Sequence, residues 1–482
     1  MKTEELIGFV PGNRITGRTD GEITGVTFDS RQVTEGGLFV AIRGTAADGH
    51  AYIGEACEQG AACVVCEQVP EDPAAEVTWV EVEDSRRALA HIAAAWYGHP
   101  SRELRMVGVT GTNGKTTVTT LLYRLHAGLG YRAGLLSTIE VMIGAERFPA
   151  THTTPDPMRI NRYLRQMVDA GCEFCFMEVS SHAVTQKRIA GLQFDGAVFT
   201  NLTHDHLDYH GTFREYLEAK KAFFDGLEAE AFALVNSDDK NGEVMLQNCV
   251  AEKYRYGLRR MADFRGRILE PLFEGSRMEI NGMETWIRLP GTFNASNILA
   301  IYGVSVLLGH APVEVLEQIS KLSPVPGRFE TLRGDSGTTA VVDFAHTDDA
   351  LENVLQTIRE VNRGSGEIIV VVGAGGDRDR TKRPKMGAVA AKLADKVILT
   401  SDNPRSESPE AILAGMEEGI PQPERGRVMK ITDREEAIKT ACMLAREKDV
   451  ILVAGKGHEK TQEIMGVKHP FDDTEVIRNY LT

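Results

Sequence analysis

The segment 107–117, Val-Gly-Val-Thr-Gly-Thr-Asn-Gly-Lys-Thr-Thr, combines residue types that could bind phosphate. It predicts an apolar strand at 105–109, then a Gly-rich turn, then a helix from about 117 to 128. Gly111 and Gly114 permit a tight turn whose backbone N–H groups converge on an anion. The N-terminus of the helix adds partial positive charge at the same place. The segment therefore predicts an anion site between a strand and a helix.

The residues that follow the turn indicate which anion binds. Lys115 could reach the terminal phosphates of a nucleoside triphosphate, and the Thr116 hydroxyl could ligate Mg²⁺. The general phosphate-loop pattern has a Gly where this chain has Val109, so the loop is a variant of that pattern. An ordinary Gly-rich turn is the alternative, but Lys115, Thr116 and Thr117 in sequence favour a nucleoside triphosphate site.

Glu178 and His206 lie at or after the ends of two other apolar runs, which we predict to be strands. Glu178 ends a predicted buried strand at 174–179, where a carboxylate is costly unless it is paired or bound to a metal. With Thr116 it could hold Mg²⁺ through hard oxygen ligands; an N-cap or a buried hydrogen bond is the alternative. His206 belongs to His204-Asp-His-Leu-Asp-Tyr-His210, directly after a predicted strand at 196–200. We expect a metal or catalytic role for His206, and a solvated loop is the alternative.

The predicted helix 216–224 carries Lys220 on the same face as Tyr216. A lysine on such a helix is usually solvated, and the pattern alone assigns Lys220 no role. Loops near the C-terminus carry Arg378, Arg405 and Glu459. Arginine forks suit carboxylates, so two Arg and one Glu fit a zwitterion with more than one carboxylate and an amine. For residues 402–405 the alternative is a turn into a helix capped by Ser408.

The chemistry-bearing loops follow strands in two alternating strand and helix units. We expect a small α/β domain at 1–100, a linker at 97–101, a phosphate-loop α/β domain at 101–326, and a doubly wound parallel domain at 327–482. Ligands of such sheets bind beyond the carboxyl ends of the strands. Each large sheet should therefore present one functional edge, and two facing edges would make a cleft between domains.

The composition narrows the class of protein. A chain of 482 residues with a net charge of −15 predicts two to four domains and argues against nucleic-acid binding. The N-terminus lacks a signal pattern and no apolar run could span a bilayer, so we expect a cytoplasmic protein with reduced cysteines. Cys63, Cys66, Cys172 and Cys175 could supply four zinc ligands, although both pairs read as buried strands.

The motifs resemble those of the Mur ligase family, whose members use ATP to join an amino acid to a carboxylate. The resemblance covers nearly the whole chain and depends on residues 110–117, 178–182, 205–211, 402–405 and 455–459. It implies three domains: a UDP-substrate-binding domain at 1–100, a central ATP-binding domain at 101–326, and a Rossmann-like amino-acid-binding domain at 327–482.

The resemblance also implies roles for individual residues. The UDP-muramoyl-peptide would contact Ser30, Thr45, Ala46, Ala47, Thr153, Thr154, Ser180, Gln186 and Arg188. ATP would contact Gly111, Thr112, Asn113, Gly114, Lys115, Thr116, Thr117, Asn294, Arg328 and Asp343. Mg²⁺ would be held by Thr116, Glu178, His206 and Lys220, the last as a carbamate (N6-carboxylysine), and catalysis would depend on Lys115, Glu178, His206 and Lys220. The amino acid would contact Arg378, Asp402, Asn403, Pro404, Arg405, Gly455 and Glu459.

Arg405 decides which amino acid the resemblance implies. Family members that add lysine lack this arginine, and a second carboxylate needs such a partner, so we expect meso-diaminopimelate to be added to UDP-N-acetylmuramoyl-L-alanyl-D-glutamate. The substrate carboxylate would attack the γ-phosphorus of ATP, and the amine would displace phosphate from the resulting acyl phosphate. We expect a monomer with these small-molecule substrates as its only partners.

Three alternatives remain open at this stage. They are a lysine-adding ligase, a ligase similar to folylpolyglutamate synthase, and a silent ligand-binding paralogue. The family usually has Tyr-Ala-His-Thr-Pro-Asp where this chain has Phe344-Ala-His-Thr-Asp-Asp349. Without the Tyr hydroxyl and the Pro, this loop could be looser or its nucleotide contacts shifted.

Overall fold

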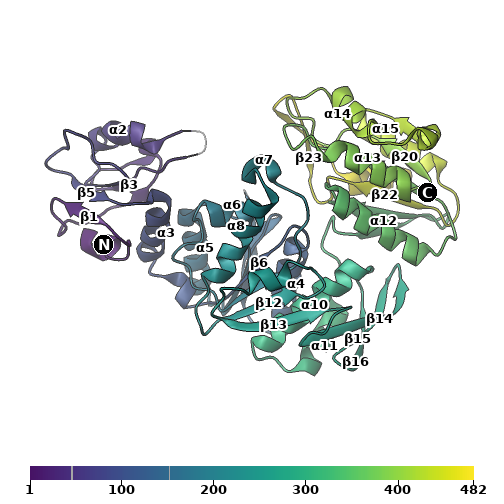
Figure 1. Cartoon of the computed structure of the whole chain (residues 1–482), viewed down its shortest axis with the longest axis horizontal. Helices are drawn as coiled ribbons and strands as arrows, with labels where there is room; N and C mark the ends of the chain where they lie inside the picture. Colours follow the sequence, from purple (N-terminus) through teal and green to yellow (C-terminus); the bar gives the residue numbers. More distant parts are fainter. Residues whose placement is uncertain (45–46, 151, 482) are drawn as a thin grey trace.

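The computed structural model describes residues 1–44, 47–150 and 152–481. Three sheets follow one another along the chain, each with helices packed against it (Figure 1). The first sheet has the strand order β1-β5-β4-β3-β2. Its strands and helices are α1 (Thr3–Ile7), β1 (Arg14–Thr16), β2 (Val26–Thr27), β3 (Leu38–Val40), α2 (Ile53–Glu58), β4 (Cys63–Cys66), β5 (Thr78–Glu81) and α3 (Ser85–Trp96).

The second sheet has eleven strands in the order β16-β15-β14-β13-β12-β11-β6-β10-β7-β8-β9. Its strands are β6 (Arg105–Thr110), β7 (Ala133–Leu136), β8 (Glu140–Ile143), β9 (Glu146–Pro149), β10 (Phe174–Glu178), β11 (Gly196–Phe199), β12 (Phe232–Asn236), β13 (Glu252–Gly257), β14 (Phe264–Leu272), β15 (Gly275–Ile280) and β16 (Met283–Ile287). Its helices are α4 (Lys115–Gly128), α5 (Pro157–Asp169), α6 (Ser181–Thr185), α7 (Leu207–His210), α8 (Phe213–Asp225), α9 (Gly242–Met245), α10 (Thr292–Leu307) and α11 (Pro312–Lys321).

The third sheet has six strands in the order β17-β18-β22-β19-β20-β21, and a separate hairpin, β23-β24, follows it. The strands are β17 (Glu330–Arg333), β18 (Thr339–Asp343), β19 (Ile368–Val372), β20 (Lys396–Leu399), β21 (Val428–Lys430), β22 (Val450–Ala454), β23 (Thr461–Ile464) and β24 (Val467–Pro470). The helices are α12 (Asp348–Asn362), α13 (Lys382–Leu393), α14 (Pro409–Glu417), α15 (Arg434–Leu444) and α16 (Asp473–Tyr480).

The central strands of both large sheets are parallel and buried on both faces. β6, β10 and β11 pair in parallel, as do β18, β22 and β19. Their apolar runs are continuous rather than alternating because helices cover both faces of each sheet. In the second sheet, one apolar cluster includes residues of α4, α10 and α11, and another includes residues of α5 and α8. The expected α/β architecture with parallel sheets is confirmed.

The predicted boundaries differ from the observed ones where backbone groups have other partners. Helix α4 begins at Lys115, two residues earlier than expected, because Gly114 adopts φ +88° and ends the turn there. Strand β2 is limited to Val26–Thr27, and the N–H of Ile23 before it donates to the carbonyl of Met1. Helix α3 has Asp84 as its N-cap.

A buried histidine on α4 predicts a pH dependence of stability. His126 is fully buried against the rings of Phe174 and Phe176, and its ring centroid lies 4.9 Å from that of His310. Burial, together with the nearby His310 and Arg105, lowers the pKa of His126 to about 4, although the hydrogen bond to the carbonyl of Leu122 opposes the shift. The unfolded chain therefore binds the proton more strongly than the folded protein.

The free energy of unfolding should consequently fall as the pH drops from about 6.5 to about 4, by up to about 3 kcal/mol from this residue. Denaturant titrations across this range would measure the fall, with His126→Leu as the comparison. The variant should have a flatter profile between these pH values. An identical profile in the variant and the parent protein would contradict the assignment to His126.

Candidate active site

A cavity of about 480 Å³ lies between the second and third sheets, at the carboxyl ends of their parallel strands. The phosphate loop contributes one wall, and loops that follow β19, β20 and β22 contribute another. Two facing sheet edges therefore form a cleft, as the sequence predicted. The predicted residues on its walls are Thr112, Asn113, Gly114, Lys115, Thr116, Thr153, Thr154, Glu178, Ser180, Arg188, His206, Arg328, Arg378, Asp402, Asn403, Arg405, Gly455 and Glu459.

The phosphate loop can exist only with glycine at two positions. Gly111 has φ +151°, and a Cβ there would lie 1.9 Å from Thr200 Oγ1. A Cβ on Gly114 would lie 2.7 Å from Asn297 Oδ1. Lys115 Nζ donates to the carbonyls of Gly111 and Thr112, at 2.8 and 2.9 Å. The ammonium is thus folded back over the loop, close to where phosphate oxygens would lie.

Glu178 makes buried hydrogen bonds, which were one of the alternatives to metal binding. Its side chain is 0% exposed, Oε1 accepts from the N–H of Thr138 at 2.7 Å, and Oε2 lies 3.1 Å from the Thr138 hydroxyl. The N-cap alternative is wrong, because Ser180 caps α6 by accepting from the N–H of Ala183. Glu178 still lines the cavity beside Thr116, so its carboxylate is held in place where a cation could bind.

Unlike a typical lysine on a surface helix, Lys220 is not solvated. Its side chain is 1% exposed, and Nζ donates to the carbonyl of Gly111 at 2.8 Å. Nζ also lies 4.7 Å from the centroid of the Tyr216 ring. Burial, with Lys115 nearby, lowers the pKa of Lys220 well below its usual value. The neighbouring Lys221 pairs instead with Asp225.

His206 precedes α7 with φ +55°, and it lines the cavity. Its ring centroid lies 5.0 Å from that of His182 and 6.1 Å from that of Tyr216. Burial, together with Lys115 and His182, lowers the pKa of His206 to about 3 against the opposing charge of Asp205. The imidazole is therefore neutral at pH 7, the form that ligates metals.

The far end of the cavity is built around Arg405 and its neighbours. Arg405 has φ +51°, and Nη1 donates to the carbonyl of Gly376 at 2.6 Å. Gly455 is required beside Asp402, since a Cβ there would lie 2.4 Å from Asp402 Oδ2. Pro404 is not among the described residues that line the cavity; its carbonyl instead packs against Gly376. The guanidinium groups of Arg378 and Arg405 thus share one wall with the carboxylate of Glu459.

A second cavity, of about 490 Å³, adjoins the first on the other side of the phosphate loop. Asn113, Gly114, Thr117, Arg328 and Asp343 line it, together with α10 and α12 residues that the sequence did not single out. Burial raises the pKa of Asp343 to about 6, and its Oδ2 accepts from the N–H of Phe329 at 2.7 Å. A mixed polar and apolar pocket beside a phosphate loop suits the nucleoside of a triphosphate.

Asn297 and Asp349 line the second cavity, although the sequence predicted no role for either residue. Asn297 faces Gly114, whereas the predicted Asn294 donates to the carbonyl of Pro290 and does not line either cavity among the described residues. Asp349 Oδ2 accepts from Asn113 Nδ2 at 3.1 Å and so joins α12 to the phosphate loop. The only signal for Asn297 was its place one helical turn after Asn294.

Other predicted residues also line neither cavity among the described parts of the chain: Gly111 and Lys220, which contact each other, and Ser30, Ala47 and Gln186. Ser30 donates to Glu55 Oε2 at 2.9 Å in the first α/β unit, and Ala47 is exposed in the same unit. The side-chain oxygen Oε1 of Gln186 accepts from the Arg188 guanidinium at 2.6 and 3.0 Å, so Gln186 supports a residue that does line the first cavity. The predicted Thr45 and Ala46 lie outside the described residues.

Zinc binding by the four cysteines is not supported. Cys63 and Cys66 lie in β4 of the first sheet, whereas Cys175 lies in β10 of the second sheet and Cys172 comes just before that strand. Burial raises the pKa of Cys63 to about 12, so its thiol stays protonated. Within the described ranges, no three His, Cys, Asp or Glu side chains are grouped to hold a metal ion.

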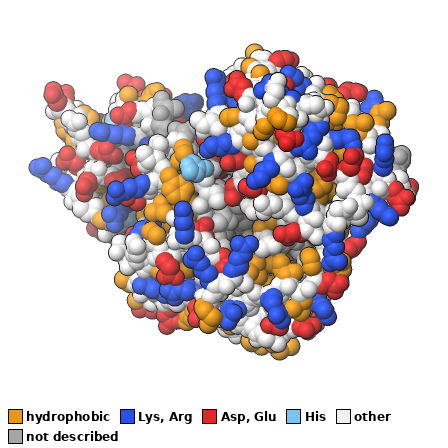
Figure 2. All heavy atoms as spheres, turned by 45° about the vertical axis from the view of Figure 1, so that its right-hand side comes forward, with side chains coloured by type: hydrophobic (Ala, Val, Ile, Leu, Met, Phe, Trp, Pro, Cys, Tyr) orange, Lys and Arg blue, Asp and Glu red, His pale blue; other side chains and the backbone are white. Residues whose placement is uncertain are grey.

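The surface carries charges of both signs. Figure 2 shows Lys and Arg side chains interspersed with Asp and Glu over the face that it presents. The net charge of −15 is therefore not gathered into one acidic field on that face. No helix in the described parts of the chain is long and apolar enough to cross a membrane.

The chain belongs to the Mur ligase family. Profiles described as Mur ligase family, catalytic domain; Mur ligase middle domain; and Mur ligase, glutamate ligase domain match residues 22–97, 109–305 and 327–457. Their order agrees with the three sheets.

Individual relatives are similar over their full length. The chain is 54% identical to UDP-N-acetylmuramoyl-L-alanyl-D-glutamate–2,6-diaminopimelate ligase of Phocaeicola vulgatus, covering 99% of each chain. It is 55% identical to the protein of the same name from Parabacteroides distasonis, over 99% of this chain and 98% of that one. A solved structure of a ligase with that name matches with a TM-score of 0.71 at 32% identity, over 100% of this chain and 98% of the other.

At the departure from the usual family pattern, Phe344 contacts Arg328 and Asp348 begins a helix. The Phe344 ring lies 4.5 Å from the Arg328 guanidinium, and Arg328 Nη2 donates to Thr116 Oγ1 at 3.2 Å. Asp348 is the first residue of α12, which Thr347 caps. Acidic residues and proline are both favourable at that position, so the loop does not depend on proline.

We therefore expect Phe344→Tyr combined with Asp348→Pro to leave the KM for ATP within about twofold, because a tyrosine ring keeps the face that contacts Arg328. The ATP dependence of phosphate release measures this. Phe344→Leu, which removes the ring, should raise the KM for ATP. A large change in the double variant would mean that the departure alters nucleotide binding.

Proposed function

We propose that this chain is an ATP-dependent ligase that adds meso-2,6-diaminopimelate to UDP-N-acetylmuramoyl-L-alanyl-D-glutamate, in peptidoglycan precursor synthesis. The observation that carries the proposal is that one cavity joins Lys115 of the phosphate loop to Arg378, Arg405 and Glu459. The names of relatives above 50% identity support the same substrates. The reaction belongs in the cytoplasm, where its nucleotide substrates are made, and we propose a monomer.

The residues have separate tasks in this reaction. Thr153, Thr154, Ser180 and Arg188 hold the peptide end of the UDP substrate, whose D-glutamate side-chain carboxylate attacks the γ-phosphorus of ATP. Lys115 and the backbone N–H groups of the loop stabilise the negative charge on the transferring phosphoryl group. The amine of diaminopimelate then attacks the acyl phosphate, forms the amide and releases phosphate. Closure of the cleft excludes water that would hydrolyse the acyl phosphate.

The donor set fits Mg²⁺ bound with ATP. Glu178 and Thr116 offer hard oxygen atoms on one wall, and His206 offers a neutral imidazole. Burial lowers the pKa of the Lys220 amine beside Gly111, which favours the un-ionised form that a carbamate requires. When bound, the metal supplies positive charge that offsets the charge of the phosphates.

The remaining assignments complete the proposal. The UDP group contacts Ser30 and the loop at 44–47. ATP contacts Gly111, Thr112, Asn113, Gly114, Thr116, Thr117, Asn294, Arg328 and Asp343. We add Asn297 to the ATP contacts because it lines the second cavity. Asp402, Asn403, Pro404 and Gly455 shape the diaminopimelate end. We place the domain boundaries near residues 100 and 326.

The test is phosphate release from ATP with UDP-N-acetylmuramoyl-L-alanyl-D-glutamate present. Three reactions are compared, with meso-diaminopimelate, with L-lysine and with no amino acid. Turnover confined to diaminopimelate is expected. Turnover with lysine instead would be consistent with a ligase but would overturn the assignment of Arg378 and Arg405 to diaminopimelate binding. No turnover with either amino acid would refute the proposed ligase activity.

A further inference from the structure

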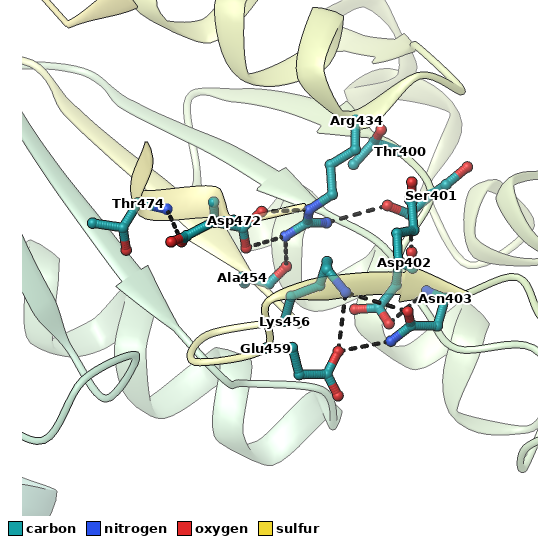
Figure 3. A network of polar contacts seen from close by, with 12 residues as sticks. Thr400, Ser401, Asp402, Asn403, Arg434, Ala454, Lys456, Glu459, Asp472 and Thr474 are labelled. Atoms are coloured by element: carbon teal, nitrogen blue, oxygen red, sulfur yellow. Dashed lines mark hydrogen bonds and ion pairs between the residues drawn. The ribbon is translucent and has the colours of Figure 1, made fainter. Parts of the chain in front are cut away.

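A buried lysine lies behind the amino-acid end of the cavity. Lys456, in the loop between β22 and β23, is 0% exposed. Its Nζ donates to Asn403 Oδ1 at 3.2 Å, to Glu459 Oε2 at 3.0 Å and to the carbonyl of Thr461 at 2.6 Å. All three ammonium protons thus have acceptors, which is the condition under which a charge can be buried. Figure 3 shows the contacts with Asn403 and Glu459.

This network determines which atoms of Asn403 and Glu459 remain for a ligand. Asn403 Oδ1 accepts from Lys456 and from the N–H of Glu463, so its amide nitrogen must face Glu459. That nitrogen donates to Glu459 Oε2 at 2.7 Å. Both contacts of Glu459 therefore fall on the same carboxylate oxygen, as the dashed lines in Figure 3 show. Oε1 and the second amide hydrogen of Asn403 are left for a substrate.

The charge of Lys456 also affects selectivity. Glu459 keeps a third of its side chain exposed and lines the cavity with Arg378 and Arg405. An unpaired carboxylate there would attract any ammonium group, including the simple amine of a lysine side chain. Because Lys456 offsets that charge, an ammonium alone binds weakly, and a ligand must also offer a carboxylate to the arginines.

A separate ion pair holds the backbone of the same loops. Arg434 forms a fork with Asp473 at 2.7 and 2.8 Å, and both side chains are fully buried. Arg434 also donates to the carbonyls of Ser401 and Ala454, at the ends of β20 and β22 (Figure 3). The loops that carry Asn403 and Glu459 are therefore anchored without Lys456.

From these contacts we propose that Lys456 is a positioning residue that orients Glu459 and Asn403 toward the zwitterionic end of the amino acid and thereby excludes lysine. The inference rests on the ligase function proposed above. Lys456 touches no substrate atom; it acts through the two side chains that do.

The test is Lys456→Met, compared with Lys460→Met. Lys460 is an exposed neighbour that pairs with Asp472 outside the cavity. Lys456→Met should raise the KM for diaminopimelate by about tenfold or more, because two ligand-binding side chains lose their orientation. The KM values for ATP and for the UDP substrate should stay unchanged, and activity with L-lysine relative to diaminopimelate should rise. Lys460→Met should match the parent protein.

A double-mutant cycle separates positioning from general support of the fold. If Lys456 acts through Glu459, adding Lys456→Met to Glu459→Gln should raise the KM for diaminopimelate little further. A purely structural role would lower the melting temperature and kcat and leave that KM unchanged, which would overturn the proposal. If Lys456→Met does not fold, Lys456→Gln should show a smaller rise in the same KM. Absence of diaminopimelate-dependent turnover in the parent protein would instead refute the proposed function.

Discussion

Replacing Lys115 by methionine is expected to lower kcat for phosphate release by about a thousandfold or more, since one preorganised cationic donor is lost where charge develops. In the structure its ammonium lies within 2.9 Å of two loop carbonyls and lines the cavity. Methionine keeps the length of the side chain and removes the charge. The thermal midpoint should therefore change much less than the rate.

Single-turnover measurements at saturating ATP would separate chemistry from binding. Lys321→Met is the matched control, because Lys321 is exposed on α11 and pairs only with Glu317 among the contacts described there. It should keep full activity. A Lys115→Met protein with kcat near that of the parent would show that the backbone N–H groups suffice for phosphoryl transfer.

The second large effect is expected from Arg405→Lys, which should raise the KM for diaminopimelate by about a hundredfold because a point charge replaces a bidentate fork. The substitution also removes the donor to the carbonyl of Gly376, so the loop that carries Arg378 loses a contact. The KM for ATP should remain unchanged, because Arg405 lies on the wall of the first cavity only.

Steady-state kinetics with varied diaminopimelate would measure this effect. Arg363→Lys provides the control: Arg363 is exposed and, like Arg405, has a left-handed backbone, with φ +49°. The control reports any cost of placing lysine in that conformation. If both variants kept the parent KM, another side chain would have to bind the second carboxylate.

The sequence predicted the parts of the site that short motifs carry. The phosphate loop and the loops with Arg378, Arg405 and Glu459 each follow an apolar strand, and the parallel topology of each sheet brings the ends of its strands to one edge, so that two edges face each other. Partners that come from elsewhere in the chain could not be predicted. Thr138 binds Glu178 from forty residues away, and only the folded chain shows that contact.

Burial was also hard to predict for polar residues. The helix pattern around Lys220 suggested solvent, yet the residue lies under the phosphate loop with its amine on Gly111. Lys456 lies within the motif 455–459, but the motif predicted a role only for Gly455 and Glu459. In both residues the role of the lysine depends on acceptors contributed by distant loops.

The two cavities share a wall made of Asn113, Gly114, Arg328, Phe344 and His346. A single molecule can therefore extend from the nucleoside pocket, past the phosphate loop, to the arginines at the far end. An inhibitor that tethers an adenosine analogue to a dicarboxylic amino acid would bind its second half as an intramolecular step, at a high effective concentration. The length of the tether, more than the affinity of either half, would then determine its potency.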